Sequence, residues 1–249
     1  MSRISGLSLP GSHGAIPGPQ QGRSDGLRQV VSAQVQNNGS ALADTLTFTV
    51  PADLQNDDYA VLMTMKSDDA NPTFPGETFT QLSSQGGTSG TPDRGLSIAY
   101  KRITDAATEI SGSPWTFTTA SAKQHLGFLY VIRGVNTSTP FDVNGLGNTD
   151  TPINPCTSQV LTTTGSGRLG LWFWGGARTT SGTHEITQAP VGFKNNVYAA
   201  AAEANDVCFG AAGAVLIPAA IETSYGTVQA QTASTAFVTM LGAVTLILA

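Results

Sequence analysis

Hydrophobic and polar residues alternate with a period of two along much of the chain, a pattern that predicts strands with one buried face. The clearest example is residues 45–50, where Leu46 and Phe48 share one face and threonines occupy the other. Residues 114–119 repeat the pattern with aromatic and threonine positions. Threonine and aromatic side chains also favour strands by propensity. Both segments are therefore predicted to be half-buried strands.

One segment, residues 125–135, is hydrophobic at both sets of alternating positions. Leu126 and Phe128 point to one face of the predicted strand, while Leu129 and Val131 point to the other. A strand that is hydrophobic on both faces is typical of a central position covered on both sides. We expect this segment to be the strand around which the fold is organised.

Further short patterns occur on both sides of this segment, separated by loops rich in glycine, proline and threonine. Strands are predicted at residues 59–66, 79–82, 96–103, 158–163, 168–174, 196–204, 207–217, 223–232 and 236–248. Residues 106–110 can form one helical turn, and residues 136–155 are predicted to be a long loop. Many short strands without a long amphipathic helix predict an all-β, jelly-roll-like β-sandwich over residues 41–249.

The first forty residues differ from the rest, because glycine and proline interrupt any regular element there. Only residues 27–35 can form a short helix or strand. Residues 1–40 are either a disordered tail or an extended arm that docks on a neighbouring subunit, and such an arm can span about 130 Å. We favour the arm, with basic and hydrophobic docking contacts. These are Arg3, Leu7, Leu9, Arg23, Leu27, Arg28, Val30 and Val31.

The charge distribution limits the partners of the main domain. Only 12% of the residues are charged, against about 25% in ordinary globular proteins. Residues 1–40 carry three arginines and one aspartate, which leaves nine basic and sixteen acidic side chains in the remainder. An acidic main domain argues against binding to nucleic acid. Surfaces rich in threonine suit contact between subunits, because a hydroxyl is less costly to desolvate than a charge.

Cysteine usage and targeting signals add two expectations. Cys156 and Cys208 can form a pair, but two cysteines in a chain of this size do not make a disulfide framework, and we favour free thiols. The N-terminus lacks the hydrophobic core of a signal peptide. The hydrophobic run at residues 236–249 is too short to span a bilayer. We expect a protein made in a cytoplasm, with no membrane partner.

Motifs for enzymatic chemistry are not found in the sequence. His13, His125 and His184 are far apart and lack partners at metal-binding spacing. The segment Gly165-Ser-Gly167 is predicted to be a turn between strands, not a nucleophile elbow. No glycine-rich segment has the lysine and helix of a phosphate-binding loop. The protein is therefore predicted not to be an enzyme and to need no cofactor.

Two groups of side chains leave alternatives open. Asp53, Asp57-Asp58 and Asp68-Asp69 surround one predicted strand and are interpreted as solvated charges. A loop Ca²⁺ site is the next candidate, and a glycosidase pair is a third. Trp172 and Trp174 share one strand face, where they either fill the core or lie at an intersubunit or glycan-binding surface.

Five segments in a fixed order resemble a recurrent β domain of tailed-bacteriophage virion proteins. They are residues 75–79, 98–103, 115–118, 129–135 and 139–142. The sequence departs from the family at residues 77–79, where Glu-Thr-Phe stands in place of the usual tryptophan turn. The residues that match most closely form a core signature. They are Tyr100, Trp115, Phe117, Tyr130, Ile132, Arg133 and Gly134.

The resemblance implies a non-enzymatic structural protein of the virion, often assembled as a homotrimer. The leading interpretation is a capsid decoration or cement protein whose residues 1–40 dock on major capsid or tail proteins. The alternative is a tail fibre or baseplate appendage subunit that binds a receptor or carbohydrate. Location on the head or the tail stays open at this point.

Overall fold

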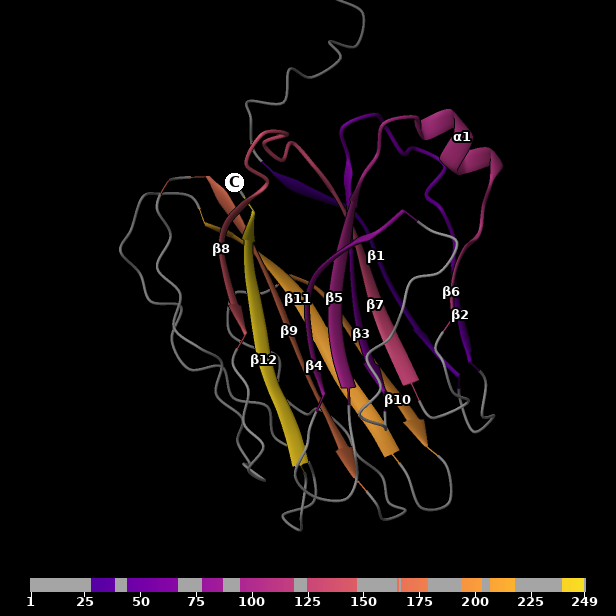
Figure 1. Ribbon diagram of the computed structural model, residues 1–249. Coiled ribbons are helices and arrows are strands. Elements are labelled where there is room, and N and C mark those ends of the chain that lie inside the picture. Colours follow the sequence, from indigo (N-terminus) through magenta and orange to yellow (C-terminus); the bar gives the residue numbers. More distant parts are fainter. Residues whose placement is uncertain are drawn as a thin grey trace, which may run out of the picture.

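The computed structural model describes residues 28–38, 44–66, 78–86, 95–118, 125–146, 165, 167–178, 194–202, 207–217 and 239–248. Within these ranges the chain forms antiparallel strands and one short helix (Figure 1). The elements are β1 (Gln29–Asn37), β2 (Thr45–Phe48), β3 (Tyr59–Lys66), β4 (Thr80–Gly86), β5 (Gly95–Arg102), α1 (Ala106–Ser111), β6 (Trp115–Thr118), β7 (His125–Arg133), β8 (Phe141–Leu146), β9 (Arg168–Arg178), β10 (Lys194–Ala202), β11 (Val207–Ile217) and β12 (Thr239–Leu248).

Two five-stranded sheets make up the sandwich. The first has the order β1-β7-β3-β5-β4 and the second has the order β10-β11-β9-β12-β8. The first half of the chain thus supplies one sheet and the second half supplies the other. The prediction of an all-β sandwich is confirmed.

A third, smaller layer covers the outer face of the first sheet. It consists of the two-stranded sheet β2-β6 together with α1 (Figure 1). An isolated pair of four-residue strands is at best marginally stable in water. The pair β2-β6 therefore depends on the hydrophobic surface beneath it.

Strand β7 lies between β1 and β3 in the first sheet. Its residues Leu126, Phe128, Tyr130 and Ile132 face the second sheet in the inner core. Leu129 and Val131 belong to the outer core, under β2 and β6. The expected central strand with two covered faces is confirmed, and the two hydrophobic clusters explain why both sets of positions are hydrophobic.

The inner core fills the space between the two large sheets. Phe128 of the first sheet and Phe173 of the second meet edge to face, with ring centroids 5.0 Å apart. The other buried members of this cluster are Tyr59, Val61, Met63, Met65, Ile98, Leu126, Tyr130, Ile132, Val135, Leu169, Leu171, Ala212, Ala214 and Leu248.

Helix α1 begins at an aspartate cap. The Asp105 carboxylate accepts hydrogen bonds from the Thr108 hydroxyl at 2.7 Å and from the Thr108 amide at 3.1 Å. These bonds lower the pKa of Asp105, with the hydroxyl as the main cause. Glu109 then accepts from Trp115 Nε1 at 2.7 Å and pairs with Lys101 at 2.7 Å. The predicted helical turn is confirmed, and it anchors β6 to β5.

Gly127 permits the outer layer to approach β7 closely. A Cβ atom added at this position would lie 2.9 Å from Phe48 Cζ and 3.0 Å from Leu46 Cδ1. Real Cβ atoms essentially never come within 3.0 Å of another heavy atom, so a side chain here must displace the side chains of Phe48 and Leu46. Glycine at position 127 is explained by this contact.

We expect Gly127→Val to lower the free energy of unfolding by about 1–3 kcal/mol, the usual cost of overpacking a core. Chemical denaturation followed by tryptophan fluorescence measures the change. The matched control is Thr47→Val, because Thr47 lies on the exposed face of β2. A Gly127→Val variant as stable as the parent protein would contradict the close approach.

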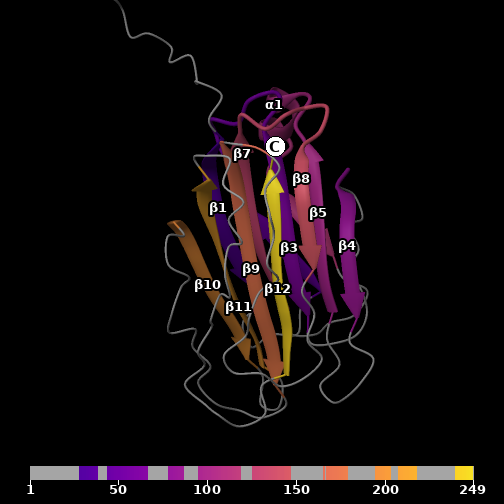
Figure 2. The same ribbon diagram turned by 90° about the vertical axis from the view of Figure 1, so that its left-hand side faces the viewer.

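The boundary predicted at residue 41 is wrong, because β1 belongs to the sandwich. Residues Gln29–Asn37 pair with β7 along the edge of the first sheet, and β1 lies beside β10 of the second sheet (Figure 2). Val30 and Val31 point to opposite cores, with a register shift between Val30 and Ser32. Residues Gln29–Asn37 contain no glycine or proline, so this stretch can form a strand.

A second correction concerns the loop predicted at residues 136–155. Its part Phe141–Leu146 forms β8, which pairs with β12 at the edge of the second sheet. Asparagine and glycine are unfavourable in strands, so the local sequence of this stretch does not predict one. The strand forms by pairing with β12, which lies about a hundred residues later in the chain. The strand predicted at residues 196–204 is confirmed as β10. Those predicted at 158–163 and 223–232 lie outside the described residues.

Candidate functional site

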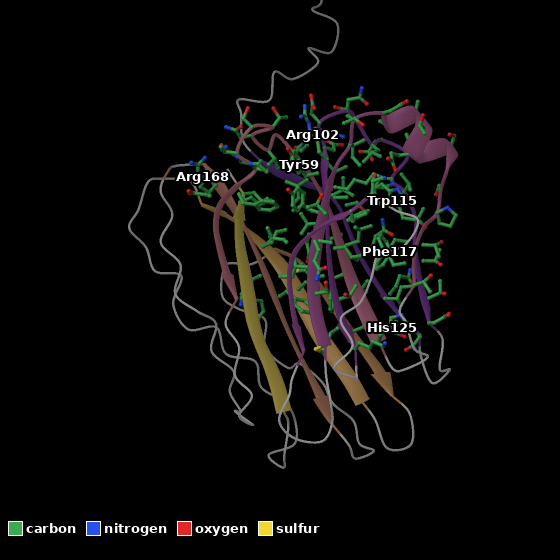
Figure 3. The ribbon with its side chains drawn as sticks, viewed as in Figure 1. Tyr59, Arg102, Trp115, Phe117, His125 and Arg168 are labelled. Atoms are coloured by element: carbon green, nitrogen blue, oxygen red, sulfur yellow. The ribbon has the colours of Figure 1, made fainter. Side chains whose placement is uncertain are left out.

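The first described residue, Arg28, is the point where the N-terminal segment joins the sandwich. Arg28 Nη1 donates to the carbonyl oxygen of Gly167 at 2.5 Å. Next to Gly167, Arg168 Nε donates to Asp142 Oδ2 at 3.0 Å. Arg28 leads into β1 of the first sheet, whereas Asp142 and Arg168 lie in β8 and β9 of the second. The cluster therefore connects the two sheets at the end where Figure 3 labels Arg168.

Two glycines shape this cluster. Gly167 has a φ of 64°, which glycine adopts without strain. A Cβ atom added at Gly165 would lie 2.6 Å from Arg168 Nη2, so the guanidinium packs directly on the glycine. Gly167 thus presents its carbonyl to Arg28, and Gly165 makes room for Arg168, while the predicted turn between them includes Ser166, which lies outside the described residues.

Among the described residues of the cluster, two arginines face one acidic side chain. Burial lowers the pKa of Arg28, the nearby Arg168 lowers it further, and Asp142 raises it in part. The Asp142 side chain is 5% exposed and that of Arg168 is 20% exposed. Two arginines thus share one buried carboxylate at the base of the N-terminal segment.

The docking residues predicted from the sequence divide into two groups. Arg3, Leu7, Leu9, Arg23 and Leu27 lie outside the described residues. Arg28 is in the cluster described above, while Val30 packs on the inner core and Val31 on the outer core. That these two valines contact a neighbouring subunit stays a prediction, and their side chains are partly buried against the sandwich.

The seven residues of the core signature lie in the first sheet and its outer layer. Trp115 and Phe117 belong to the outer core, and Tyr130 and Ile132 to the inner core. Tyr100 is half-buried, stacks on Tyr59 with centroids 6.4 Å apart and meets Phe141 edge to face at 4.8 Å. The aromatic members therefore build the fold on both sides of the sheet.

The last two signature residues mark the end of β7. Gly134 has a φ of 82°, so the chain turns there through a conformation that favours glycine. Arg133 forms a bidentate pair with Asp58, with Nε to Oδ1 at 2.9 Å and Nη2 to Oδ2 at 2.8 Å. Arg133 Nη2 also donates to the carbonyl oxygen of Asp53 at 2.8 Å. The side-chain bonds to Asp58 are the main cause that raises the pKa of Arg133.

The interpretation of Asp58 as a solvated charge is therefore wrong. Its side chain is 1% exposed, and its Oδ2 also accepts from the Gln55 amide at 2.9 Å. Arginine and a backbone amide occupy the carboxylate oxygens that a calcium ion would need. The acidic pair at residues 57–58 thus holds the strand end together.

The neighbouring Asp57 pairs with Arg102 at 2.6 Å on the surface. Its φ of 70° is one that aspartate tolerates better than most residues. The bond to Asp57 is the main cause that raises the pKa of Arg102. Tyr59 lies below this pair (Figure 3), where burial raises the pKa of its hydroxyl. Asp68 and Asp69 lie outside the described residues.

Four buried polar residues lie together on the outer face of the first sheet, a group that the sequence analysis missed. Lys66 is opposite His125, and Thr64 is opposite Ser97. All four are at most 3% exposed. Asn38 Nδ2 lies 3.2 Å from His125 Nδ1, and the His125 amide donates to Asn38 Oδ1 at 3.1 Å. The available signal was the polar Thr64 and Lys66 at alternate positions of the otherwise hydrophobic strand β3.

Several further predictions concern positions where little is described. Trp172 is buried on the face of β9 opposite the inner core, and the side chain of Trp174 is not described. Cys156, His13 and His184 lie outside the described residues, and Cys208 is described only as part of β11. Among described residues, no group of three histidine, cysteine or acidic side chains is placed to hold a metal ion. No helix there is long and hydrophobic enough to cross a membrane.

The chain was compared with family models, curated proteins and solved structures. No family model matches it, and neither curated proteins nor solved structures include a match.

Proposed function

We propose that the protein is a non-enzymatic structural subunit of a tailed-bacteriophage virion, acting as a capsid decoration or cement protein. The observation that carries the proposal is the ordered series of segments that resembles the virion β domain. The described signature residues of that series lie together in the first sheet and its outer layer. Because these residues pack within one folded unit, they support a similarity between its fold and that of the virion β domain.

The geometry at Arg28 supports a docking role for the residues that precede it. Strand β1 is an edge strand of the first sheet, and Arg28 ties its start to the second sheet. A segment attached in this way is held firmly at its base. Twenty-seven residues in extended form can reach about 90 Å, enough to contact a neighbouring subunit.

The proposed partners are further copies of this chain, as a homotrimer, and a major capsid or tail protein. The scarcity of charged residues, 12% of the chain, favours subunit contacts that desolvate few charges. We place the protein in the virion after assembly in the host cytoplasm. Under the alternative, a tail appendage that binds a receptor or carbohydrate, it would be found at the tail.

We expect deletion of residues 1–27 to leave the sandwich folded and to abolish incorporation into particles. The deletion spares β1, whereas deletion of residues 1–40 removes it and exposes both cores at the sheet edge. The shorter deletion should therefore keep the parent melting temperature, and the longer one should lower it by several degrees.

Particles purified from cells that co-express the other virion proteins measure incorporation, and cryo-electron microscopy gives the location. A variant with residues 1–27 scrambled at constant composition is the control for length and charge. Normal incorporation of the shorter deletion would contradict the docking role. Absence of the intact protein from purified particles would contradict the proposed function as a whole.

A further inference from the structure

The two arginines at the base of the N-terminal segment have more hydrogen-bond donors than acceptors nearby. A guanidinium carries five N–H donors. Arg28 donates one hydrogen bond, to the neutral carbonyl of Gly167, and Arg168 donates one, to Asp142. The Nε atom of Arg28 is buried and has no hydrogen-bond partner among the described residues. A buried donor without an acceptor is costly, so an additional acceptor would stabilise the cluster.

The charges lead to the same conclusion. Arg168 repels the charge on Arg28, and Asp142 is the acidic group that offsets this repulsion. Asp142 already accepts from Arg168, at 3.0 Å. Among the described residues, the cluster thus holds two guanidinium groups and one carboxylate in a half-buried setting, where a second anion would interact more strongly than on an open surface.

We propose that Arg28 and Arg168 form a binding site for one carboxylate, supplied by an acidic protein side chain. The planar guanidinium fork matches the two oxygens of a carboxylate. Asp25, three residues before Arg28, is the only acidic residue in positions 1–27 and is one source. An acidic side chain of a docked partner is the other. The site does not depend on the proposed virion role, because the two arginines would bind a carboxylate in the same way whether it comes from this chain or from a partner.

The test observes the Nε–H groups of arginine by nuclear magnetic resonance in the full chain. Succinate is the probe, added to the parent protein and to Asp25→Asn, with sodium chloride at matched ionic strength as the reference. An Arg28→Lys variant assigns the Arg28 signal. Arg102 and Arg133 are internal controls, because their Nε atoms already donate to Asp57 and Asp58.

We expect succinate to shift the Arg28 signal in a saturable way in Asp25→Asn, while the two control signals stay in place. An equal shift in the parent protein identifies a partner as the source, and a smaller shift identifies Asp25. Arg168→Gln should abolish the shift. Arg168→Lys, which keeps the charge but loses the fork, should weaken binding at least tenfold.

Three results would overturn the site. They are no saturable shift in either protein, an equal shift with sodium chloride, and an unchanged shift in both Arg168 variants. The Arg102 and Arg133 signals also report whether each variant is folded. Failure here would leave the virion proposal intact, since incorporation into particles is measured separately.

Discussion

Asp58→Asn is expected to lower the free energy of unfolding by about 3–5 kcal/mol, the usual cost of removing one partner from a buried ion pair. The Asp58 carboxylate receives three hydrogen bonds, two from Arg133 and one from the Gln55 amide. An asparagine would place an NH₂ group against one of these donors. The loss should fall toward the lower end of the range, because the Arg133 side chain is 22% exposed and keeps access to water.

The adjacent Asp57 gives a matched control for this variant. Asp57 also pairs with an arginine, but its side chain is 58% exposed and that of Arg102 is 43% exposed. Exposed pairs contribute little to stability, and asparagine tolerates the positive φ at this position. Asp57→Asn should therefore remain close to the parent protein in urea denaturation. Equal losses in the two variants would show that burial does not determine the strength of the Asp58–Arg133 pair.

Phe48→Ala is the second change with a large expected effect, about 3–5 kcal/mol, as for other buried phenylalanines. Phe48 is fully buried, meets Phe117 edge to face at 5.8 Å and covers Gly127 of β7. Because the pair β2-β6 is too small to be stable alone, we expect its amides to lose protection from hydrogen exchange before those of β3 and β7.

Two further variants make the Phe48 prediction specific. Thr47→Ala, on the exposed face of the same strand, should change stability little. Gly127→Val should cost less in a Phe48→Ala background, because the removed ring leaves space for the new side chain. Additive losses in the double variant, or unchanged exchange in β2 and β6, would contradict the close packing of the outer layer on Gly127.

Alternation along the strands was sufficient to predict much of the fold. In β3, β5, β7 and β9, the local pattern and the tertiary environment agree, so the strands could be placed from the sequence. The pattern failed in β8, where asparagine and glycine interrupt it. It also left β1 unresolved, because a short run of valines beside a glycine- and proline-rich segment is compatible with a helix, a strand or an arm.

The candidate site was predictable only in part. Arg28 was included as a basic residue of the arm, and Gly165-Ser-Gly167 was predicted to be a turn. Their contact joins residues 139 positions apart in the sequence. No local pattern specifies such a distant contact, which depends on how the two sheets pack.

The sequence by itself determined that the chain is all-β and that β7 is covered on both faces, since its two hydrophobic stripes each require a buried environment. Only the tertiary structure decided what covers each stripe, which carboxylate pairs with Arg133 and how Arg28 meets Arg168. The physical reason is the distance along the chain over which each property is set. Burial patterns are local properties of a strand, whereas the partners of a side chain depend on strand order and on the register between distant segments.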